Sequence, residues 1–217
     1  MNEFLGRKKE LAFLEEKYKS KNGEFVIIYG RRRIGKTETI SHFCKNKNAV
    51  FFTCTQTDNK SQLKNFSEKI LSFNLPQSKY ITEFSSWEHA FLALKEISAA
   101  NEEKKIVVID EFPYMAKEYA EIPSVLQKVW DTELKKENIL LILCGSSMSY
   151  IEKEILSEKN PLYGRATGIY KMLPMSFSDS SLFFPNWNKK DKIIAHAILG
   201  GIPYYFSLFN PKKKLKE

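Results

Sequence analysis

A short apolar segment that runs straight into a glycine-framed loop constrains this chain more than any other feature. Residues 25–29 (FVIIY) have the composition of a buried strand, and residues 30–37 (GRRRIGKT) follow without a break. Glycines let a backbone bend tightly enough for its N–H groups to surround an anion. The spacing therefore predicts a strand, an anion-binding loop and a helix, in that order.

The loop has the P-loop pattern G-x-x-x-x-G-K-[ST], in which the anion is a nucleotide phosphate. Lys36 supplies a positive charge to the β- and γ-phosphates, and the hydroxyl of Thr37 can hold Mg²⁺. The helix that starts here also points its positive end at the same anion. A chance glycine–lysine turn is the alternative, and the strand in front of the loop argues against it.

A second strand-like segment ends in two carboxylates. Residues 106–109 (IVVI) precede Asp110 and Glu111, and a continuous apolar run of this kind is typical of a strand buried on both faces of a parallel sheet. Ligands in such folds sit at the carboxyl ends of the strands. We therefore expect Asp110 to bind the Mg²⁺ of a nucleotide and Glu111 to orient or deprotonate the attacking water. Two solvated carboxylates that close a strand are the alternative for this segment taken alone.

Strand-like and helix-like segments alternate along the chain, which predicts an α/β fold whose parallel sheet is covered on both sides. The expected strands are 25–29, 49–53, 106–110, 139–144 and 169–173. The expected helices are 37–46, 59–73, a segment capped by Ser86 with apolar residues up to Ile97, a segment that begins near Pro123, and 191–199. Ser146 follows the fourth strand, and it is either a γ-phosphate sensor or a cap of the next helix.

The chain changes character after Leu173. An aromatic-rich stretch is followed by a helix that ends at Gly200 and Gly201, and then by residues 202–206 (IPYYF). We expect residues 1–175 to form the core and residues 176–217 to form the start of a small helical lid subdomain that is truncated.

The formal net charge of +8 raises the question of nucleic-acid binding. Much of the excess lies in the C-terminal lysines and in the loop arginines, and no nucleic-acid motif stands out, so a solvated surface is the favoured interpretation. The cysteines and histidines are scattered singly, which indicates neither a zinc site nor a disulfide framework. The sequence has no basic leader and no apolar window of about eighteen residues, so we expect a cytoplasmic protein without a membrane span.

Taken in order, the motifs resemble those of the archaeal-type ATPase family of the AAA+ and STAND P-loop NTPases. The resemblance rests on an F-x-G-R-x-x-E-L box at residues 4–11, on GRRRIGKT, VIDEF, LCGSS and GRATG, and on GGIPYYF. It implies a three-layer P-loop NTPase sandwich with a central parallel five-stranded sheet and an extra strand between the P-loop strand and the Asp110 strand. Many members continue into a winged helix and a nuclease-like region. DNA contact through such a C-terminal region and homo-oligomerisation are therefore hypotheses about partners.

The resemblance also implies roles for residues outside the two motifs. Phe4, Gly6 and Arg7 would lie beside the adenine, and Pro203 would pack near the base; ordinary helix boundaries are the alternative at both places. Arg165 would be a γ-phosphate sensor or finger, in its own site or in a neighbour's, and a plain surface arginine is the alternative. The residues expected to contact ATP or ADP are Phe4, Gly6, Arg7, Gly30, Arg31, Arg32, Arg33, Ile34, Gly35, Lys36, Thr37, Glu38 and Pro203. The expected catalytic residues are Lys36, Glu111, Ser146 and Arg165, and the expected Mg²⁺ ligands are Thr37 and Asp110.

These residues predict ATP binding and Mg²⁺-dependent hydrolysis to ADP and phosphate, which drives a conformational change in a partner or a C-terminal region. A nucleotide-gated switch or binding module with negligible turnover is the alternative. A small-molecule kinase is disfavoured, because its lid would be rich in arginines and arginines are sparse after Arg33.

Overall fold

Five parallel strands form the centre of the molecule in a computed structural model that describes residues 4–98, 103–213 and 215. The strands are β1 (Glu24–Tyr29), β2 (Ala49–Thr53), β3 (Lys105–Asp110), β4 (Ile139–Gly145) and β5 (Gly168–Lys171). Their order across the sheet is β2-β3-β4-β1-β5, and every pairing is parallel. The expected parallel five-stranded sheet is confirmed. As the resemblance implies, β4 separates the P-loop strand β1 from the Asp110 strand β3.

The central strands form because they are apolar on both faces. All residues of β1 and β4 are buried, as expected for inner strands of a parallel sheet. Successive side chains point to opposite faces, so Phe25 and Ile27 belong to one hydrophobic core while Val26 and Ile28 belong to another. The sheet is therefore the middle of three layers.

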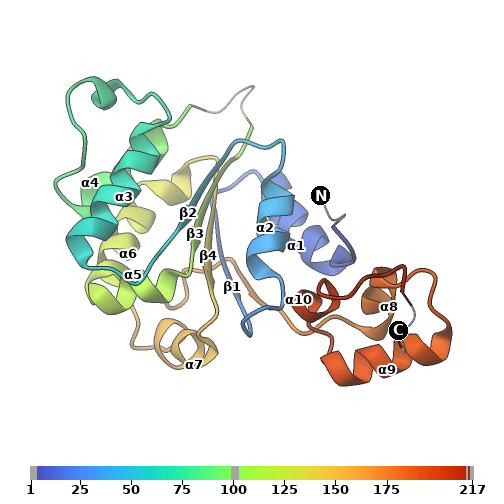
Figure 1. Ribbon diagram of the computed structural model, residues 1–217. Coiled ribbons are helices and arrows are strands. Elements are labelled where there is room, and N and C mark those ends of the chain that lie inside the picture. Colours follow the sequence, from blue (N-terminus) through green and yellow to red (C-terminus); the bar gives the residue numbers. More distant parts are fainter. Residues whose placement is uncertain (1–3, 99–102, 214, 216–217) are drawn as a thin grey trace.

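Helices cover both faces of this sheet (Figure 1). The core that contains Phe25 is closed by α3, α4, α5 and α6, and the core that contains Val26 is closed by α1 and α2. On α6, for example, Leu126, Val129 and Trp130 are buried against the sheet. The helices are α1 (Lys8–Lys19), α2 (Lys36–Cys44), α3 (Asn59–Leu71), α4 (Trp87–Leu92), α5 (Phe112–Glu118), α6 (Ile122–Thr132), α7 (Met148–Tyr150), α8 (Phe177–Ser180), α9 (Lys189–Leu199) and α10 (Pro203–Phe206).

Several expected elements end at other residues in the structure. Ser86 caps α4 as predicted, accepting a hydrogen bond from the backbone N–H of His89 at 3.3 Å, but the helix passes into a 3₁₀ turn at Ala93–Glu96. The last strand stops at Lys171 rather than at residue 173, because its pairing with β1 ends opposite Tyr29. The helix after the loop ends at Cys44, since the backbone of the following residue leaves the helical region. In the same way α3 ends two residues early, and α9 begins two residues early, capped by Asn188.

Residues 176–213, here called the C-terminal helical segment, have a small hydrophobic core of their own. It consists of Phe184, Trp187, Ala195 and Phe206. The indole N–H of Trp187 donates to the backbone carbonyl of Lys213 at 2.7 Å, which holds the end of the segment against the start of α9. In Figure 1 the segment lies beside the helices α1 and α2, with α10 nearest the start of α2. Over the described part of the chain, no helix combines the length and the apolar composition needed to cross a membrane.

Candidate functional site

A cleft of about 1090 Å³ opens where β1, β3 and β4 end. It lies between the loop that follows β1 and the C-terminal helical segment, and it also reaches the residues in front of α1. The sequence-predicted residues that line it are Phe4, Arg7, Arg32, Arg33, Gly35, Lys36, Thr37, Glu38, Glu111, Ser146 and Pro203. The fold therefore gathers segments from both ends and the middle of the chain at the carboxyl edge of the sheet, where ligands of parallel sheets bind.

The loop after β1 owes its shape to two glycines and one buried side chain. A Cβ on Gly30 would lie 2.4 Å from the carbonyl oxygen of Met172, so only glycine allows this approach. Gly35 has a φ of +88°, in the left-handed region that favours glycine. Between them, Ile34 is fully buried in the core beneath the loop. The loop is thus anchored at its centre and bent at both ends.

Lys36 and Thr37, at the start of α2, place a charge and a hydroxyl at the cleft. Lys36 is only 5% exposed, and its Nζ donates to the backbone carbonyls of Gly30 at 2.9 Å and Arg31 at 3.1 Å. Thr37 Oγ1 donates to Asp110 Oδ2 at 2.7 Å, and Asp110 is 1% exposed at the end of β3. This bond ties the phosphate-loop motif to the acidic strand end, which lies 73 residues further along the chain.

The oxygen atoms of Thr37 and Asp110 fit Mg²⁺. Magnesium favours hard oxygen ligands, and in nucleotide sites it takes one or two from the protein and the rest from phosphate and water. A hydroxyl and a carboxylate 2.7 Å apart supply that protein share. In residues 4–98, 103–213 and 215 no group of three or more His, Cys, Asp or Glu side chains is arranged to hold a metal by itself.

Glu111 lies next to this pair and is held in an unusual backbone conformation. Its φ of 52° and ψ of 37° are left-handed, and its N–H donates to Asp110 Oδ1 at 3.0 Å. Strain of this kind is often retained at functional sites. The Oε2 atom of Glu111 accepts two hydrogen bonds from Ser146, one from Oγ at 2.9 Å and one from the backbone N–H at 3.2 Å. The hydroxyl of Ser146 thus points at the Glu111 carboxylate. No side-chain hydrogen bond caps the start of α7.

Two buried cysteines flank the acidic strand end. Burial raises the pKa of the Cys54 thiol, and the nearby Asp110 carboxylate raises it further. The same two causes, in the same order, raise the pKa of the Cys144 thiol well above its ordinary value. Both residues therefore remain neutral thiols and act as small apolar fillers, as their isolated positions in the sequence indicate.

Arg7, in the segment before α1, contacts the buried side of the loop that follows β1. It is 4% exposed, and its guanidinium donates to the carbonyl of Ile34 at 2.6 Å and to that of Leu173 at 2.8 Å. It also pairs with Glu10 at 2.7 Å. Arg7 therefore ties the phosphate loop to the strand end of β5. Phe4 lines the cleft with its ring stacked on His42, 4.0 Å between ring centroids.

A comparison of sequences decides the family. The chain matches the family described as an ATPase domain predominantly from Archaea over residues 4–209. It belongs to this ATPase family. The resemblance drawn from the motifs is thereby confirmed.

One sequence relative and two solved structures that resemble this ATPase domain are longer than the chain. The uncharacterized protein MJECL04 of Methanocaldococcus jannaschii is 37% identical over 202 residues, which cover 93% of this chain and 43% of the relative. The Walker-type ATPase PABY2304 of Pyrococcus abyssi has a TM-score of 0.70 at 22% identity, over 94% of this chain and 65% of that one. The ORC2 protein of Aeropyrum pernix, solved as ADPNP-ADP complexes, has a TM-score of 0.64 at 16% identity, over 95% of this chain and 61% of that one. At these identities the two solved structures show the shared fold. The chain spans less than half the length of the M. jannaschii relative.

Besides Arg165, five residues that the sequence predicts for the candidate site do not line the cleft. Gly30 and Ile34 shape and anchor the loop, Arg31 offers its carbonyl to Lys36, and Asp110 is reached through Thr37. Gly6 has a φ of 71°, and a Cβ there would lie 3.0 Å from Asp179 Cβ, so its role is a close approach to α8. Adenine contact by the segment at Phe4, Gly6 and Arg7 remains a prediction.

Arg165 lies at the opposite edge of the sheet, which corrects the role expected for it in its own site. Its Nε donates to Asp131 Oδ2 on α6 at 2.8 Å, and its NH1 donates to the carbonyl of Tyr163 at 3.2 Å. The strand β5 begins three residues later, where Gly168 pairs with Val26 near the amino end of β1. The phosphate loop follows the carboxyl end of that same strand. A contribution of Arg165 to a neighbouring copy stays a prediction.

Three tyrosines that contact arginines of the loop are not among the site residues predicted from the sequence. Tyr114 lies on α5 one turn after Glu111, and its hydroxyl accepts a hydrogen bond from Arg32 at 2.9 Å. Tyr204 and Tyr205 lie on α10, where they meet Arg33. The sequence does contain a signal for them. Tyr114 follows Glu111 by three residues, and Tyr204 and Tyr205 follow Pro203 directly.

Proposed function

We propose that this ATPase domain binds ATP together with Mg²⁺ in the cleft and hydrolyses it to ADP and phosphate. The observation that carries the proposal is the 2.7 Å hydrogen bond between Thr37 Oγ1 and Asp110 Oδ2. It brings the phosphate-loop pattern and the acidic strand end to one point, which neither motif achieves alone. Membership of an ATPase family supports the same function.

The nucleotide phosphates would occupy the loop in front of α2. Lys36 Nζ is positioned there, held by two loop carbonyls that it can exchange for phosphate oxygens. Backbone N–H groups of the loop and the positive end of α2 favour the same anion. Thr37 and Asp110 would hold Mg²⁺, which when bound neutralises charge on the phosphates.

Glu111 is the residue placed to act on water. In hydrolysis the water oxygen forms a bond to the γ-phosphorus, the bond from that phosphorus to the bridging oxygen breaks, and ADP leaves with the electron pair. The proton of the water passes to the Glu111 carboxylate. Ser146 fixes Oε2 of that carboxylate through two hydrogen bonds. Within the described residues no side chain or N–H donates to Oε1, so this atom remains available to accept the proton.

A nucleotide-gated switch with negligible turnover is a second candidate. It is favoured by the same two hydrogen bonds from Ser146, because they engage the Glu111 carboxylate within the protein. If they did not yield or realign, ATP would stay bound unhydrolysed. Steady-state turnover of the isolated chain separates the two functions.

We also propose that residues 1–175 act as the ATPase core and residues 176–217 as a lid. The proposal rests on the separate hydrophobic core of the C-terminal helical segment and on the cleft side that this segment forms. Movement of this lid would drive the conformational change in a partner or in further parts of a longer protein. DNA contact and homo-oligomerisation, suggested by the resemblance, are hypotheses about that output.

The substitution Glu111→Gln tests the hydrolysis proposal. The amide keeps the shape of the side chain but cannot accept the proton, so ATP should bind and turnover should fall by about two to four orders of magnitude, a barrier increase of about 3 to 5 kcal/mol. Ser146→Ala is the matched control, since the backbone N–H still holds Oε2, and its loss should be smaller. Binding without turnover in the wild-type chain would select the switch. Normal turnover in Glu111→Gln would remove Glu111 from the mechanism.

A further inference from the structure

Two neighbouring arginines of the phosphate loop line the cleft and reach tyrosines on two different helices, α5 and α10. Arg32 NH2 donates to the hydroxyl of Tyr114, on α5 of the core, at 2.9 Å. Arg33 NH1 donates to the hydroxyl of Tyr205, on α10, at 3.3 Å. The Cζ atom of Arg33 also lies 4.9 Å from the ring centroid of Tyr204, within cation–π range. Arg33 is therefore a direct link between the loop and the C-terminal helical segment.

A second contact brings α10 onto the same loop. A Cβ built on Gly35 would be in ordinary van der Waals contact with Pro203, 3.5 Å from its Cγ. The turn that leads into α10 is fixed from behind, because the N–H of Met175 donates to the carbonyl of Gly201 at 2.7 Å. The start of α10 is thus held between the phosphate loop and the chain that leaves β5.

The backbone at Arg33 connects its side chain to the state of the loop. Its φ of 67° is left-handed, a conformation that a residue with a Cβ adopts at some energetic cost. The loop N–H groups surround the phosphates when a nucleotide binds, and this fixes the loop backbone. A nucleotide in the loop therefore fixes the backbone of Arg33. The Arg33 side chain in turn restricts the motion of Tyr204 and Tyr205, which it contacts.

We propose that Arg33 is a positioning residue that clamps α10 to the phosphate loop, so that nucleotide in the loop orders the C-terminal helical segment through Arg33. The inference rests on the proposed function only in requiring that nucleotide occupies the loop. It goes beyond that function because it assigns the coupling between nucleotide and helical segment to one loop side chain and two tyrosines of α10.

Hydrogen exchange of the α10 amides in the full chain, with and without Mg²⁺ and ADP, tests the clamp. A suitable reporter is the N–H of Ser207, which donates to the carbonyl of Pro203 at 3.0 Å. In the wild type, ADP should slow exchange at these amides. In Arg33→Ala, exchange without nucleotide should be about two- to fivefold faster, and ADP should no longer slow it although calorimetry still detects ADP binding. Arg33→Lys keeps a cation over Tyr204 and should restore part of the response.

Matched variants separate the clamp from general effects on the loop. Tyr205→Phe and Tyr114→Phe each remove one hydroxyl that accepts from a loop arginine. Only Tyr205→Phe should weaken the response of α10 to ADP. Arg32→Ala, which removes the arginine that contacts α5, should leave that response in place when calorimetry shows the variant to be saturated with ADP.

The outcomes distinguish the clamp from the nucleotide site itself. If ADP protects α10 equally in the wild type and in Arg33→Ala, the order reaches α10 by direct contact and the clamp is wrong. If Arg32→Ala abolishes the response as Arg33→Ala does, the specific assignment to Arg33 is also wrong. If the wild type fails to bind ADP, the proposed function fails, whereas faster α10 exchange in nucleotide-free Arg33→Ala would still support the clamp.

Discussion

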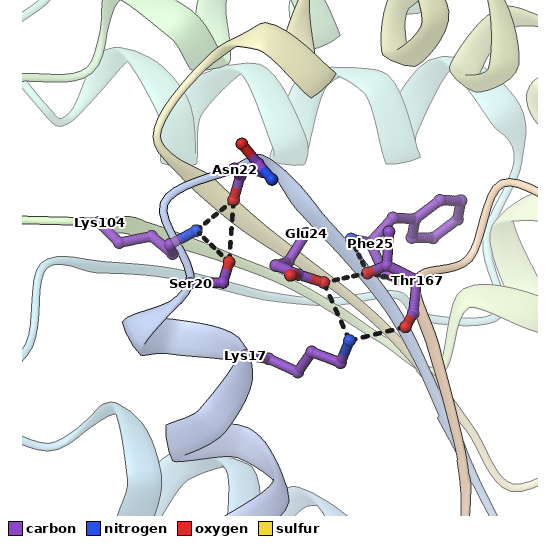
Figure 2. A network of polar contacts seen from close by, with 7 residues as sticks. All are labelled: Lys17, Ser20, Asn22, Glu24, Phe25, Lys104 and Thr167. Atoms are coloured by element: carbon purple, nitrogen blue, oxygen red, sulfur yellow. Dashed lines mark hydrogen bonds and ion pairs between the residues drawn. The ribbon is translucent and has the colours of Figure 1, made fainter.

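The two ends of the sheet each hold a lysine, a carboxylate and a threonine, yet the two trios are connected differently. At the carboxyl end they are Lys36, Asp110 and Thr37, and at the amino end they are Lys17, Glu24 and Thr167. Figure 2 shows the amino-end trio with its neighbours. Residue type alone therefore does not separate a binding site from a structural network.

At the amino end the lysine and the carboxylate of the trio pair with each other. Lys17 Nζ donates to Glu24 Oε2 at 3.2 Å and to the carbonyl of Thr167 at 2.7 Å. The Thr167 hydroxyl also donates to Glu24, and it accepts from the N–H of Phe25 at 3.0 Å. Lys104, in the same view, donates to Ser20 and to the carbonyl of Asn22 (Figure 2). The network joins α1 and the starts of β1 and β5.

The pKa of Glu24 reflects this pairing. Burial acts to raise it, but hydrogen bonds from Thr167, Ser20 and Lys17 outweigh burial and hold the pKa of the carboxyl below its ordinary value. The folded protein therefore favours the charged form of Glu24. A group of this kind stabilises the fold at neutral pH.

At the carboxyl end the charges do not satisfy each other. Lys36 meets loop carbonyls and Asp110 meets a hydroxyl and an N–H, and no ion pair joins the two among the residues that the structure describes. A cation suited to phosphate thus lines the cleft, and a carboxylate suited to Mg²⁺ lies behind Thr37, which lines the same cleft. Paired charges therefore mark a structural network, and opposite charges that are held separately mark the candidate binding site.

The largest effect should come from Asp110→Asn, which keeps the shape of the side chain and removes its charge. Turnover should fall about a hundredfold or more, close to 3 kcal/mol, because the amide is a poor ligand for Mg²⁺. The unfolding free energy should change much less, since Asp110 has no cationic partner to lose. Turnover measured across a Mg²⁺ titration, with urea unfolding as the control, checks both parts. A large loss of stability at unchanged turnover would show that Asp110 has a structural role and not a role in binding.

A smaller effect of the opposite kind is expected for Glu24→Gln. Lys17 would lose its partner in a largely buried place, so the unfolding free energy should drop by about 1 to 3 kcal/mol while turnover of the folded protein stays near that of the wild type. Urea unfolding followed by circular dichroism measures the first quantity. A variant as stable as the wild type would show that the network contributes nothing.

The pH dependence of stability sharpens this prediction. Because folding lowers the pKa of Glu24, its contribution is fully present above the ordinary carboxyl value of 4.5 and is lost as pH falls through the folded value. The gap in stability between the wild type and Glu24→Gln should therefore narrow below about pH 4.5. A gap that stayed constant from pH 7 to pH 3 would contradict the lowered pKa.

The smallest effect is expected for Arg165→Ala. Arg165 forms an ion pair with Asp131, and the two side chains are 30% and 34% exposed. Loss of this pair should therefore lower the unfolding free energy by at most about 1 kcal/mol. Turnover of dilute protein should be unchanged, because Arg165 lies at the edge of the sheet away from the cleft. A wild-type specific activity that rises steeply with protein concentration, and that depends on Arg165, would instead place this arginine in a neighbouring copy's site.

The sequence predicts the sheet and the loop well because both depend on local patterns. Apolar runs identify buried strands, and the glycines with Lys36 and Thr37 identify the loop. The position of β4 between β1 and β3 is implied by the family resemblance, because no local pattern encodes the order of strands. The meeting of Glu111 with Ser146 follows from their common position at the ends of adjacent strands. Parallel strands bring such ends to one edge.

Other features depend on contacts that no local pattern encodes. The link from Arg33 to Tyr205 joins residues 172 positions apart, and its partner depends on how the C-terminal helical segment packs. Arg165 was misplaced for a different reason. A residue just before a parallel strand lies at the amino end of the sheet, and Arg165 precedes β5 by three residues, so the position implied by the family resemblance conflicts with the strand direction.

We propose that Lys36, at the carboxyl end of the sheet, binds nucleotide, whereas Lys17, at the amino end, only stabilises the fold. Calorimetric titration of ATP and Mg²⁺ into Lys36→Ala and Lys17→Ala, each verified as folded, tests it most directly. ATP binding should be lost in Lys36→Ala, because Lys36 Nζ is the charge held at the carbonyls of Gly30 and Arg31, and it should be retained in Lys17→Ala. Unchanged ATP affinity in Lys36→Ala, or equal losses in both variants, would contradict the account.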